Sequence, residues 1–320
     1  MRILVAGGAG YVGSALAPKL LGRGYEVDVV DLLWFGSYLP EGVGVDRRDV
    51  FDLGPDDLRK YDQVVFLAGL SNDPMAEWSP AQNFIHNAAA PAYLAYTAKK
   101  AGVGRYIYAC SCSVYGYTED ELFDEEQPVA PSYPYGISKL QGEQAVLNMR
   151  DKDFSVISLR KGTISGYSPR MRLDLIVNTM FKSAVRDGVI TVNNPSIWRP
   201  IISLEDATDA YVRAVEAGAG ISGIFNIAGG NYTVGEVADQ VRSAVLQTGA
   251  KDIELRINHK QDFRNYKVST KKAADVLSFH PSHGIGDIVR DLAANCGKFG
   301  DWDNPRYYNI EVFKARNEQH

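Results

Sequence analysis

The chain has 320 residues, of which 45% are hydrophobic and 23% charged, and its formal net charge is −5. These values are ordinary for a globular enzyme with one large domain, or with a main domain and a smaller one. No apolar stretch is long enough to span a membrane, and a net negative chain is not expected to bind nucleic acid.

The chain has three cysteines, which is an odd number and too few for a disulfide framework. This scarcity indicates a reducing compartment. Cys110 and Cys112 have C-x-C spacing with no histidine cluster nearby, so we expect no metal site. The apolar N-terminus is interrupted by glycines and is interpreted as a first strand and turn rather than a secretion signal. We therefore expect a cytoplasmic protein.

Short apolar runs alternate with helical patterns in the first half of the chain. This alternation is typical of βαβ units, and it predicts an α/β, Rossmann-type, doubly wound parallel sheet with helices on both faces. Strands are predicted over 3–6, 26–30, 63–67, 105–110 and 155–159, and helices over 12–22, 81–100 and 135–149.

The spacing changes after residue 165. A helix over 174–186 is expected outside the main sheet, Ser203 can cap a helix that runs to 217, and 225–228 is expected to be a strand. Thr233 and Glu236 form a capping box that opens another helix. We predict a dinucleotide-binding domain over 1–165, completed by about 196–228, and a C-terminal substrate-binding subdomain over 166–195 and 229–320.

A glycine-rich turn lies directly between the first strand and the first helix. Gly7 permits the tight turn, Gly10 lets the backbone approach a pyrophosphate, and Gly13 allows close helix packing. The N–H groups of the helix start, around Tyr11 and Val12, then face the phosphates.

Asp31 ends the second strand, where a carboxylate can accept hydrogen bonds from the adenosine ribose and repel a 2′-phosphate. The residues that follow Asp31 carry no cation, so we expect NAD rather than NADP. Asp49 and Val50 follow a short third strand, and Asp49 is expected to bond the adenine amino group.

Tyr135 and Lys139 lie one helical turn apart on the same face, and Ser111 stands at the carboxyl end of a strand, 24 residues before Tyr135. Proton transfer near neutrality requires that the pKa of the phenol fall well below about 10. A neighbouring ammonium, with a positively charged nicotinamide, would lower it. We therefore expect Tyr135 to be an acid/base, with the Ser111 hydroxyl holding the reacting oxygen beside it.

These motifs identify a resemblance to the extended short-chain dehydrogenases, and in particular to the NAD-dependent nucleotide-sugar epimerases and dehydratases. The resemblance covers most of the chain, and the serine setting is similar to that of the UDP-glucose 4-epimerases. It rests on GGAGYVG at 7–13, Asp31, FLAGLS at 66–71, CSCSVYG at 110–116, YGISK at 135–139, RPIISLED from Arg199, FNIAGG at 225–230 and DFRNYKVSTKKA at 262–273, while SPRMRLDLIVN at 168–178 resembles a branch acting on sugars of bacterial surface polysaccharides.

The resemblance implies roles for individual residues. Lys139 would bind the nicotinamide ribose, and Arg199 and Arg264 would contact the diphosphate of the substrate. Further cofactor contacts are expected from Leu67, Ala68, Gly69 and Asn87, and further substrate contacts from Ser71, Ser113, Thr163, Arg172 and Asn178.

The same resemblance narrows the reaction. The 4,6-dehydratases of the family carry Asp-Glu where this chain has Cys112 and Ser113, so dehydration is not expected. A nucleotide-sugar 4-epimerase acting through a transient 4-keto sugar is expected, in surface polysaccharide or deoxysugar biosynthesis. Thr163 replaces the common asparagine of the family on the substrate side. The implied assembly is a homodimer formed by the helices near 81–100 and 135–149.

Three alternatives use the same residues. A nucleotide-sugar 4-ketoreductase or 4-dehydrogenase differs only in exchanging its cofactor. A dehydrogenase of apolar alcohols would share the catalytic trio but would have no use for Arg199 and Arg264. A dinucleotide sensor without catalysis would not need Ser111, Tyr135 and Lys139 together.

Overall fold

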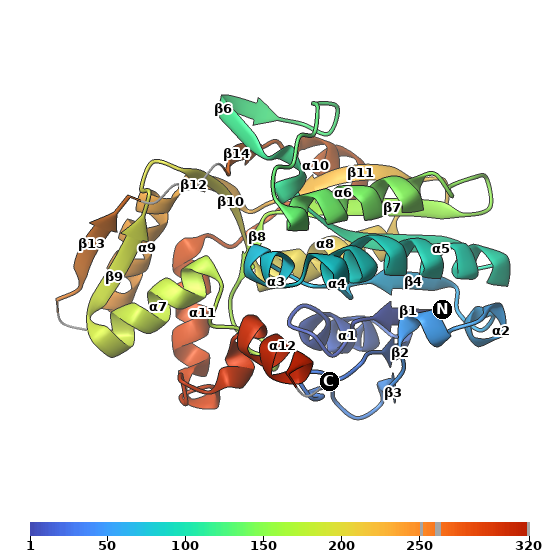
Figure 1. Ribbon diagram of the computed structural model, residues 1–320, viewed down its shortest axis with the longest axis horizontal. Coiled ribbons are helices and arrows are strands. Elements are labelled where there is room, and N and C mark those ends of the chain that lie inside the picture. The colour runs from blue at the N-terminus through green and yellow to red at the C-terminus, as the bar shows by residue number, and fades with distance from the viewer. Residues whose placement is uncertain (250–251, 260–263, 319–320) are drawn as a thin grey trace.

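The computed structural model describes residues 1–249, 252–259 and 264–318. Seven strands of the described chain form a parallel sheet in the order β11-β7-β5-β4-β1-β2-β3 (Figure 1). This order confirms the predicted doubly wound α/β class. The bounds are β1 Arg2–Ala6, β2 Glu26–Val30, β3 Gly44–Asp46, β4 Gln63–Phe66, β5 Arg105–Ser111, β7 Ser155–Lys161 and β11 Gly223–Ile227.

Helices cover both faces of this sheet, which explains why its strands are buried apolar runs rather than alternating ones. One face packs against α1, α8 and α10, and the other against α2, α5 and α6. The bounds of these helices are α1 Gly13–Gly22, α2 Pro55–Leu58, α5 Ala90–Ala101, α6 Pro134–Leu147, α8 Leu204–Glu216 and α10 Lys271–Leu277, with the 3₁₀ turn η1 Val50–Asp52 before α2.

The helix predicted over 81–100 is divided into three parts. α4 (Pro80–Phe84) leads into a π-helical turn, η2 (Ile85–Ala89), and then into α5. Asn87 lies in this turn, and its side chain bonds to Leu70, Asn83 and Ser138. Those tertiary bonds widen the helix locally, and hydrophobic periodicity carries no signal for them.

The C-terminal part forms a third core beyond the carboxyl ends of the strands, at the left of Figure 1. The predicted Ser203 cap and the Thr233–Glu236 capping box are confirmed. The elements are α7 Ile176–Asp187, α9 Val234–Gln247 and α11 Ile285–Asn295, the paired strands β9 Val189–Asn193 and β13 Glu254–Asn258, the three-stranded sheet of β8 Thr163–Ser165, β10 Trp198–Ser203 and β12 Gly230–Thr233, and the pair β6 Tyr117–Phe123 and β14 Asn265–Val268.

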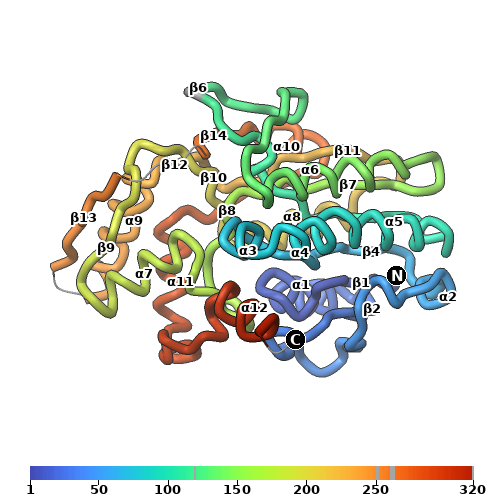
Figure 2. Tube along the Cα trace, in the orientation of Figure 1, coloured from blue at the N-terminus to red at the C-terminus, as the bar shows by residue number. Residues whose placement is uncertain are grey.

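The short elements complete the chain. They are α3 Asp73–Trp78, η3 Cys112–Tyr115, η4 Cys296–Lys298, η5 Pro305–Tyr307 and α12 Asn309–Asn317. The chain after Phe299, for which the sequence indicated no role, ends in α12, which lies between α11 and α1 in Figure 2 and contacts α3.

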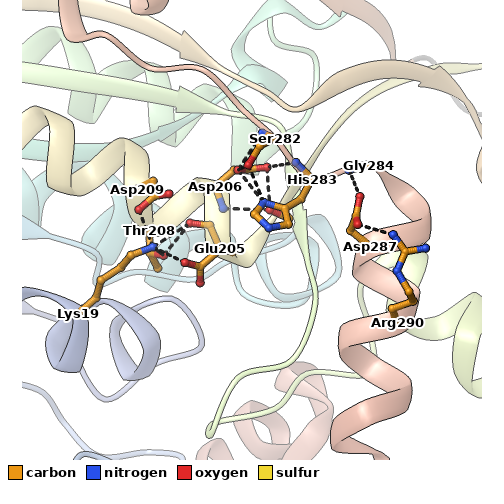
Figure 3. Close-up of polar contacts among 11 residues, drawn as sticks. Lys19, Glu205, Asp206, Thr208, Asp209, Ser282, His283, Gly284, Asp287 and Arg290 are labelled. Atoms are coloured by element: carbon orange, nitrogen blue, oxygen red, sulfur yellow. Dashed lines mark hydrogen bonds and ion pairs between the residues drawn. The ribbon is translucent and has the colours of Figure 1, made fainter. Parts of the chain in front are cut away.

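The predicted division into two parts stays an interpretation. The helix α10 belongs to the predicted smaller part, but its residues Ala273 and Leu277 pack in the same hydrophobic core as α8. The two parts are also joined by polar contacts around Asp206 at the start of α8 (Figure 3). None of the described helices is long and apolar enough to cross a membrane.

Candidate active site

One cavity of about 500 Å³ opens at the carboxyl edge of the central sheet, where ligands bind in open α/β folds. The register of the strands explains its position. Ala6 pairs with Val30 on one side and with Phe66 on the other, so Gly7, Asp31 and Leu67 emerge together.

The cavity collects nearly all of the predicted site residues. Its lining includes Gly7, Gly10, Tyr11, Val12, Gly13, Asp31, Asp49, Val50, Leu67, Ala68, Gly69, Ser71, Ser111, Ser113, Tyr135, Lys139, Thr163, Arg172, Arg199 and Arg264. Two predicted residues, Asn87 and Asn178, are not part of this lining.

Asn87 and Asn178 are fully buried and bond to the protein itself. Nδ2 of Asn87 donates to the carbonyl of Leu70, 2.9 Å away. Oδ1 of Asn178 accepts from the N–H of Gly166, and its Nδ2 donates to the carbonyl of Arg172. Both side chains support backbone segments behind the cavity wall, and Oδ1 of Asn87 has no hydrogen-bond partner among the described residues, so their contact with a ligand stays a prediction.

The glycine turn has the geometry expected of a phosphate cradle. Gly7 has φ +78°, and a Cβ there would lie 2.4 Å from the backbone nitrogen of Ala68. A Cβ on Gly13 would lie 2.4 Å from the carbonyl oxygen of Gly8, so the start of α1 is tightly packed. A Cβ on Gly10 would lie 3.2 Å from the carbonyl oxygen of Gly7. Any side chain would fill this cradle, which fits the backbone of a dinucleotide.

Asp31 stabilises that turn. Its carboxylate accepts from the N–H of Ala9 at 3.0 Å and of Leu33 at 2.7 Å. Burial raises the pKa of Asp31, while these two hydrogen bonds act in the opposite direction. Asp49 likewise accepts from a backbone N–H, that of Phe51, and both carboxylates line the cavity.

The catalytic trio meets at the end of β5. Tyr135 lies in the first turn of α6, and its phenol is close enough to Ser111 for that hydroxyl to lower its pKa. Oγ of Ser111 accepts from Oγ of Ser113 at 2.9 Å. Gly136 allows this approach, since a Cβ there would lie 2.8 Å from the carbonyl oxygen of Ser113. Nζ of Lys139 donates to the carbonyl of Ala109 at 3.0 Å.

The pKa of Tyr135 is not lowered in the protein by itself, and its lowering beside a positively charged nicotinamide stays a prediction. Burial raises the pKa of Tyr135, and the negative charge of Asp73 raises it further, against smaller opposite effects of Ser111 and Arg172. Burial also lowers the pKa of Lys139 to about 8. Both shifts follow from a dry site, where the charged form of each group is disfavoured.

The substrate side of the cavity carries three arginines. Arg172 is buried and pairs with Asp174, with Nε 2.8 Å from Oδ1. Nη1 of Arg264 lies 2.5 Å from Oδ2 of Asp73. Nη1 of Arg199 donates to the carbonyls of Trp198 and Arg264. Of the motif at 262–273, residues 262 and 263 lie outside the described residues.

The sequence did not indicate three further cations in the lining, Arg48, Lys161 and Arg170. Lys161 is the register partner of Ser111, and its Nζ donates to the carbonyl of Cys110 at 2.5 Å. Burial and the charge of Lys139 lower its pKa to about 7. Lys161 is the last residue of β7, and a lysine at the carboxyl end of a predicted strand could have been identified from the sequence. Arg170 and the cavity residue Asn309 gave no such signal, because tertiary packing alone brings them there.

Within residues 1–249, 252–259 and 264–318, no three His, Cys, Asp or Glu side chains form a group that could hold a metal ion.

Comparisons with known proteins agree with this geometry. The model of the family described as "NAD dependent epimerase/dehydratase family" matches residues 3–228. UDP-glucose 4-epimerase of Bacillus subtilis (strain 168) is 26% identical over 324 residues, covering 91% of this chain and 95% of that protein. dTDP-glucose 4,6-dehydratase of Streptomyces niveus is 27% identical over 312 residues, covering 90% of each.

Among solved structures, MoeE5 in complex with UDP-glucuronic acid and NAD matches with a TM-score of 0.80 at 25% identity, covering 91% of this chain and 97% of MoeE5. The cradle of glycines, the start of α1 and the trio at the end of β5 fit a bound NAD. The chain belongs to the NAD-dependent epimerase/dehydratase family, as an enzyme that uses NAD as its cofactor.

Proposed function

We propose that this enzyme is a nucleotide-sugar 4-epimerase that acts through a transient 4-keto sugar. The main support for the proposal is that one cavity contains both proton-transfer groups and groups that can bind a diphosphate. Ser111, Tyr135 and Lys139 supply proton transfer at a hydroxyl, and Arg199 and Arg264 supply guanidinium groups suited to a diphosphate. The names of the relatives, which include UDP-glucose 4-epimerases, support the same substrate class.

The residues divide the work as follows. Tyr135, as the phenolate, accepts the proton of the sugar O4 while Ser111 holds that oxygen by a hydrogen bond. The C4–H bond breaks and C4 becomes a carbonyl carbon. When bound, NAD supplies the acceptor of this hydride and later its donor. After the keto sugar rotates about its diphosphate linkage, C4 would be reduced on its opposite face and Tyr135 would return the proton to O4.

The cavity also supports redox without elimination. Loss of a hydroxyl needs an acid beside the leaving group, and the positions that carry it in the dehydratases are Cys112 and Ser113. The Cys112 thiol is buried, donates to the carbonyl of Arg160, and has its pKa raised by burial. Ser113 is bonded to Ser111.

The test is incubation of the purified enzyme with UDP-, dTDP-, GDP- and CDP-sugars, followed by NMR at C4. We expect one pair of C4 epimers to interconvert without net oxidation of the cofactor, and deuterium at C4 to be retained in the product. Tyr135→Phe should lower kcat by about 10²–10⁴-fold while NAD affinity stays near that of the parent.

A stoichiometric change between NAD and NADH without C4 inversion would instead identify the ketoreductase or dehydrogenase alternative. The absence of any reaction at C4 across the panel would reject the proposed substrate class. A cytoplasmic location and a homodimer through the helices near 81–100 and 135–149 stay predictions, which fractionation and light scattering address.

A further inference from the structure

Arg170 is a buried cation that forms no ion pair with a carboxylate of the described residues. It lies in the segment between β8 and α7, and only 2% of the residue is exposed. Its guanidinium carbon lies 3.6 Å from the centroid of the Phe35 ring, and Nη2 donates to Oδ1 of Asn309. The nearby Asp174 already pairs with Arg172. In the part of the chain that the structure describes, Nε and Nη1 of Arg170 have no hydrogen-bond partner.

This arrangement is costly in the protein by itself. A guanidinium has five N–H donors and stays charged, so burying it without a counter-charge and with donors unused is unfavourable. Burial and the charge of Arg172 lower the pKa of Arg170 to about 9. The charge and the two unused donors together point to an anionic ligand in the cavity that Arg170 lines.

The surroundings of Arg170 indicate which anionic ligand it binds. Phe35 follows β2 only four residues after Asp31, and Asp31 is close enough for its charge to interact with Arg170. Asp31 is in turn bonded to the glycine turn that precedes α1. The residues at the start of α1 line the same cavity as Arg170, and a helix N-terminus presents N–H groups and the positive end of its dipole to an anion.

We propose that Arg170 binds the diphosphate of NAD, opposite the N–H groups of the glycine turn, and that α12 holds Arg170 in position through Asn309. The proposal rests on the NAD site and not on the 4-epimerase reaction.

The packing of α12 explains how a C-terminal helix can position this side chain. Nδ2 of Asn309 donates to Oγ of Ser71 at 2.7 Å while its Oδ1 accepts from Arg170. Four residues further along α12, Phe313 is fully buried and stacks on Trp34, with ring centroids 5.7 Å apart. Trp34 directly precedes Phe35, so α12 fixes both the ring under the guanidinium and the amide at its tip.

The experiment measures binding to protein from which NAD has been removed. Calorimetry with NAD, NADP, ADP, adenosine and UDP is carried out on the parent, Arg170→Met, Arg170→Lys and Asn309→Ala. We expect Arg170→Met to weaken NAD and ADP about 10–100-fold, as for loss of a charge-assisted contact, and to change adenosine and UDP less than twofold. Arg170→Lys should lose less, and Asn309→Ala should weaken NAD several-fold while adenosine is unchanged.

The matched control is Arg290→Met, since Arg290 is exposed, pairs with Asp287 and lies outside this cavity. Unchanged NAD affinity in Arg170→Met would overturn the proposal, as would an equal loss of adenosine and NAD. A loss confined to UDP would assign the guanidinium to the substrate, and a loss confined to NADP would assign it to a 2′-phosphate; either result also overturns it. If Arg170→Met does not fold, the Lys and Asn309 variants decide, with melting temperature as the check.

Discussion

Glu143 on α6 and Arg160 on β7 form an ion pair in the protein interior, with Nη2 of Arg160 2.6 Å from Oε1 of Glu143 and both side chains at most 4% exposed. Oγ of Ser158 donates to the same carboxylate, and Nη1 of Arg160 donates to the hydroxyl of Tyr115. Because α6 carries the catalytic Tyr135 and β7 lies beside β5, this pair fixes the helix against the sheet that carries Ser111.

Removing one partner should therefore be strongly destabilising. We expect Glu143→Ala to lower the free energy of unfolding by about 3–5 kcal/mol, because it leaves the Arg160 guanidinium buried without a counter-charge. Urea denaturation followed by circular dichroism measures this change. The double variant Glu143→Leu, Arg160→Met should recover most of the stability. A loss below about 1 kcal/mol in Glu143→Ala would contradict this account of the pair.

The arginines on the substrate side lead to a second prediction, on recognition. Arg199→Gln and Arg264→Gln should each weaken UDP about 10–100-fold in the NAD-loaded enzyme, because each removes a charged donor to the diphosphate. NAD affinity should change less than twofold. Calorimetry provides both values, and Arg256→Gln serves as control because Arg256 is exposed and pairs with Glu254. Unchanged UDP affinity in both variants would favour an apolar alcohol as substrate.

Much of this site could be predicted from sequence because its signals are local. The glycine turn, Asp31, Ser111 and the pair of Tyr135 and Lys139 each stand at a strand end or in a helix start, and parallel strands bring such ends together. Apolar runs alternating with helices predicted the doubly wound parallel sheet, while the order of its strands came from the structure.

The rest depends on contacts between distant parts of the chain. Asn309 bonds Ser71 across 238 residues, and the pattern of α12 gives no indication of what it covers. The ligand roles expected of Asn87 and Asn178 stay predictions for a related reason. An asparagine at a suitable sequence position can bond either a ligand or the backbone, and only the fold shows which partner lies within reach.

Lys161 should make stability depend on pH. Its pKa in the folded protein is lowered to about 7 from an ordinary value of 10.5, mainly by burial. As pH falls from about 10 to 7, the unfolded chain takes up this proton before the folded protein does, so stability falls across that window. We expect Lys161→Met to remove this loss, which is on the order of 2–4 kcal/mol.

Thermal melts of the parent and Lys161→Met between pH 7 and 10 test this expectation. The gain from the substitution should be largest near pH 7 and smallest near pH 10. Lys152→Met is the matched control, because the Lys152 side chain is 89% exposed. A gain that does not depend on pH would mean that the substitution acts through packing and not through the ionisation of Lys161.

His283 and Asp206 should produce a pH effect of the opposite sign (Figure 3). Nδ1 of His283 lies 2.9 Å from Oδ1 of Asp206, and this hydrogen bond, with the charges of Asp206, Asp287 and Glu205, raises the pKa of His283 against a lowering by burial. Its contribution to stability is therefore fully present below about pH 6.5, the ordinary pKa of histidine, and is lost as pH rises through the higher folded pKa.

We expect His283→Gln to melt below the parent at pH 6 and to approach it by pH 9. Since the His283 side chain is 37% exposed, the effect is that of a surface pair, at most about 1 kcal/mol or roughly 2–4 °C in Tm. His280→Gln is the control, because His280 is exposed. A difference between His283→Gln and the parent that grows from pH 6 to pH 9 would contradict the assignment. It would mean that the neutral imidazole, and not its charge, joins α8 to the segment before α11.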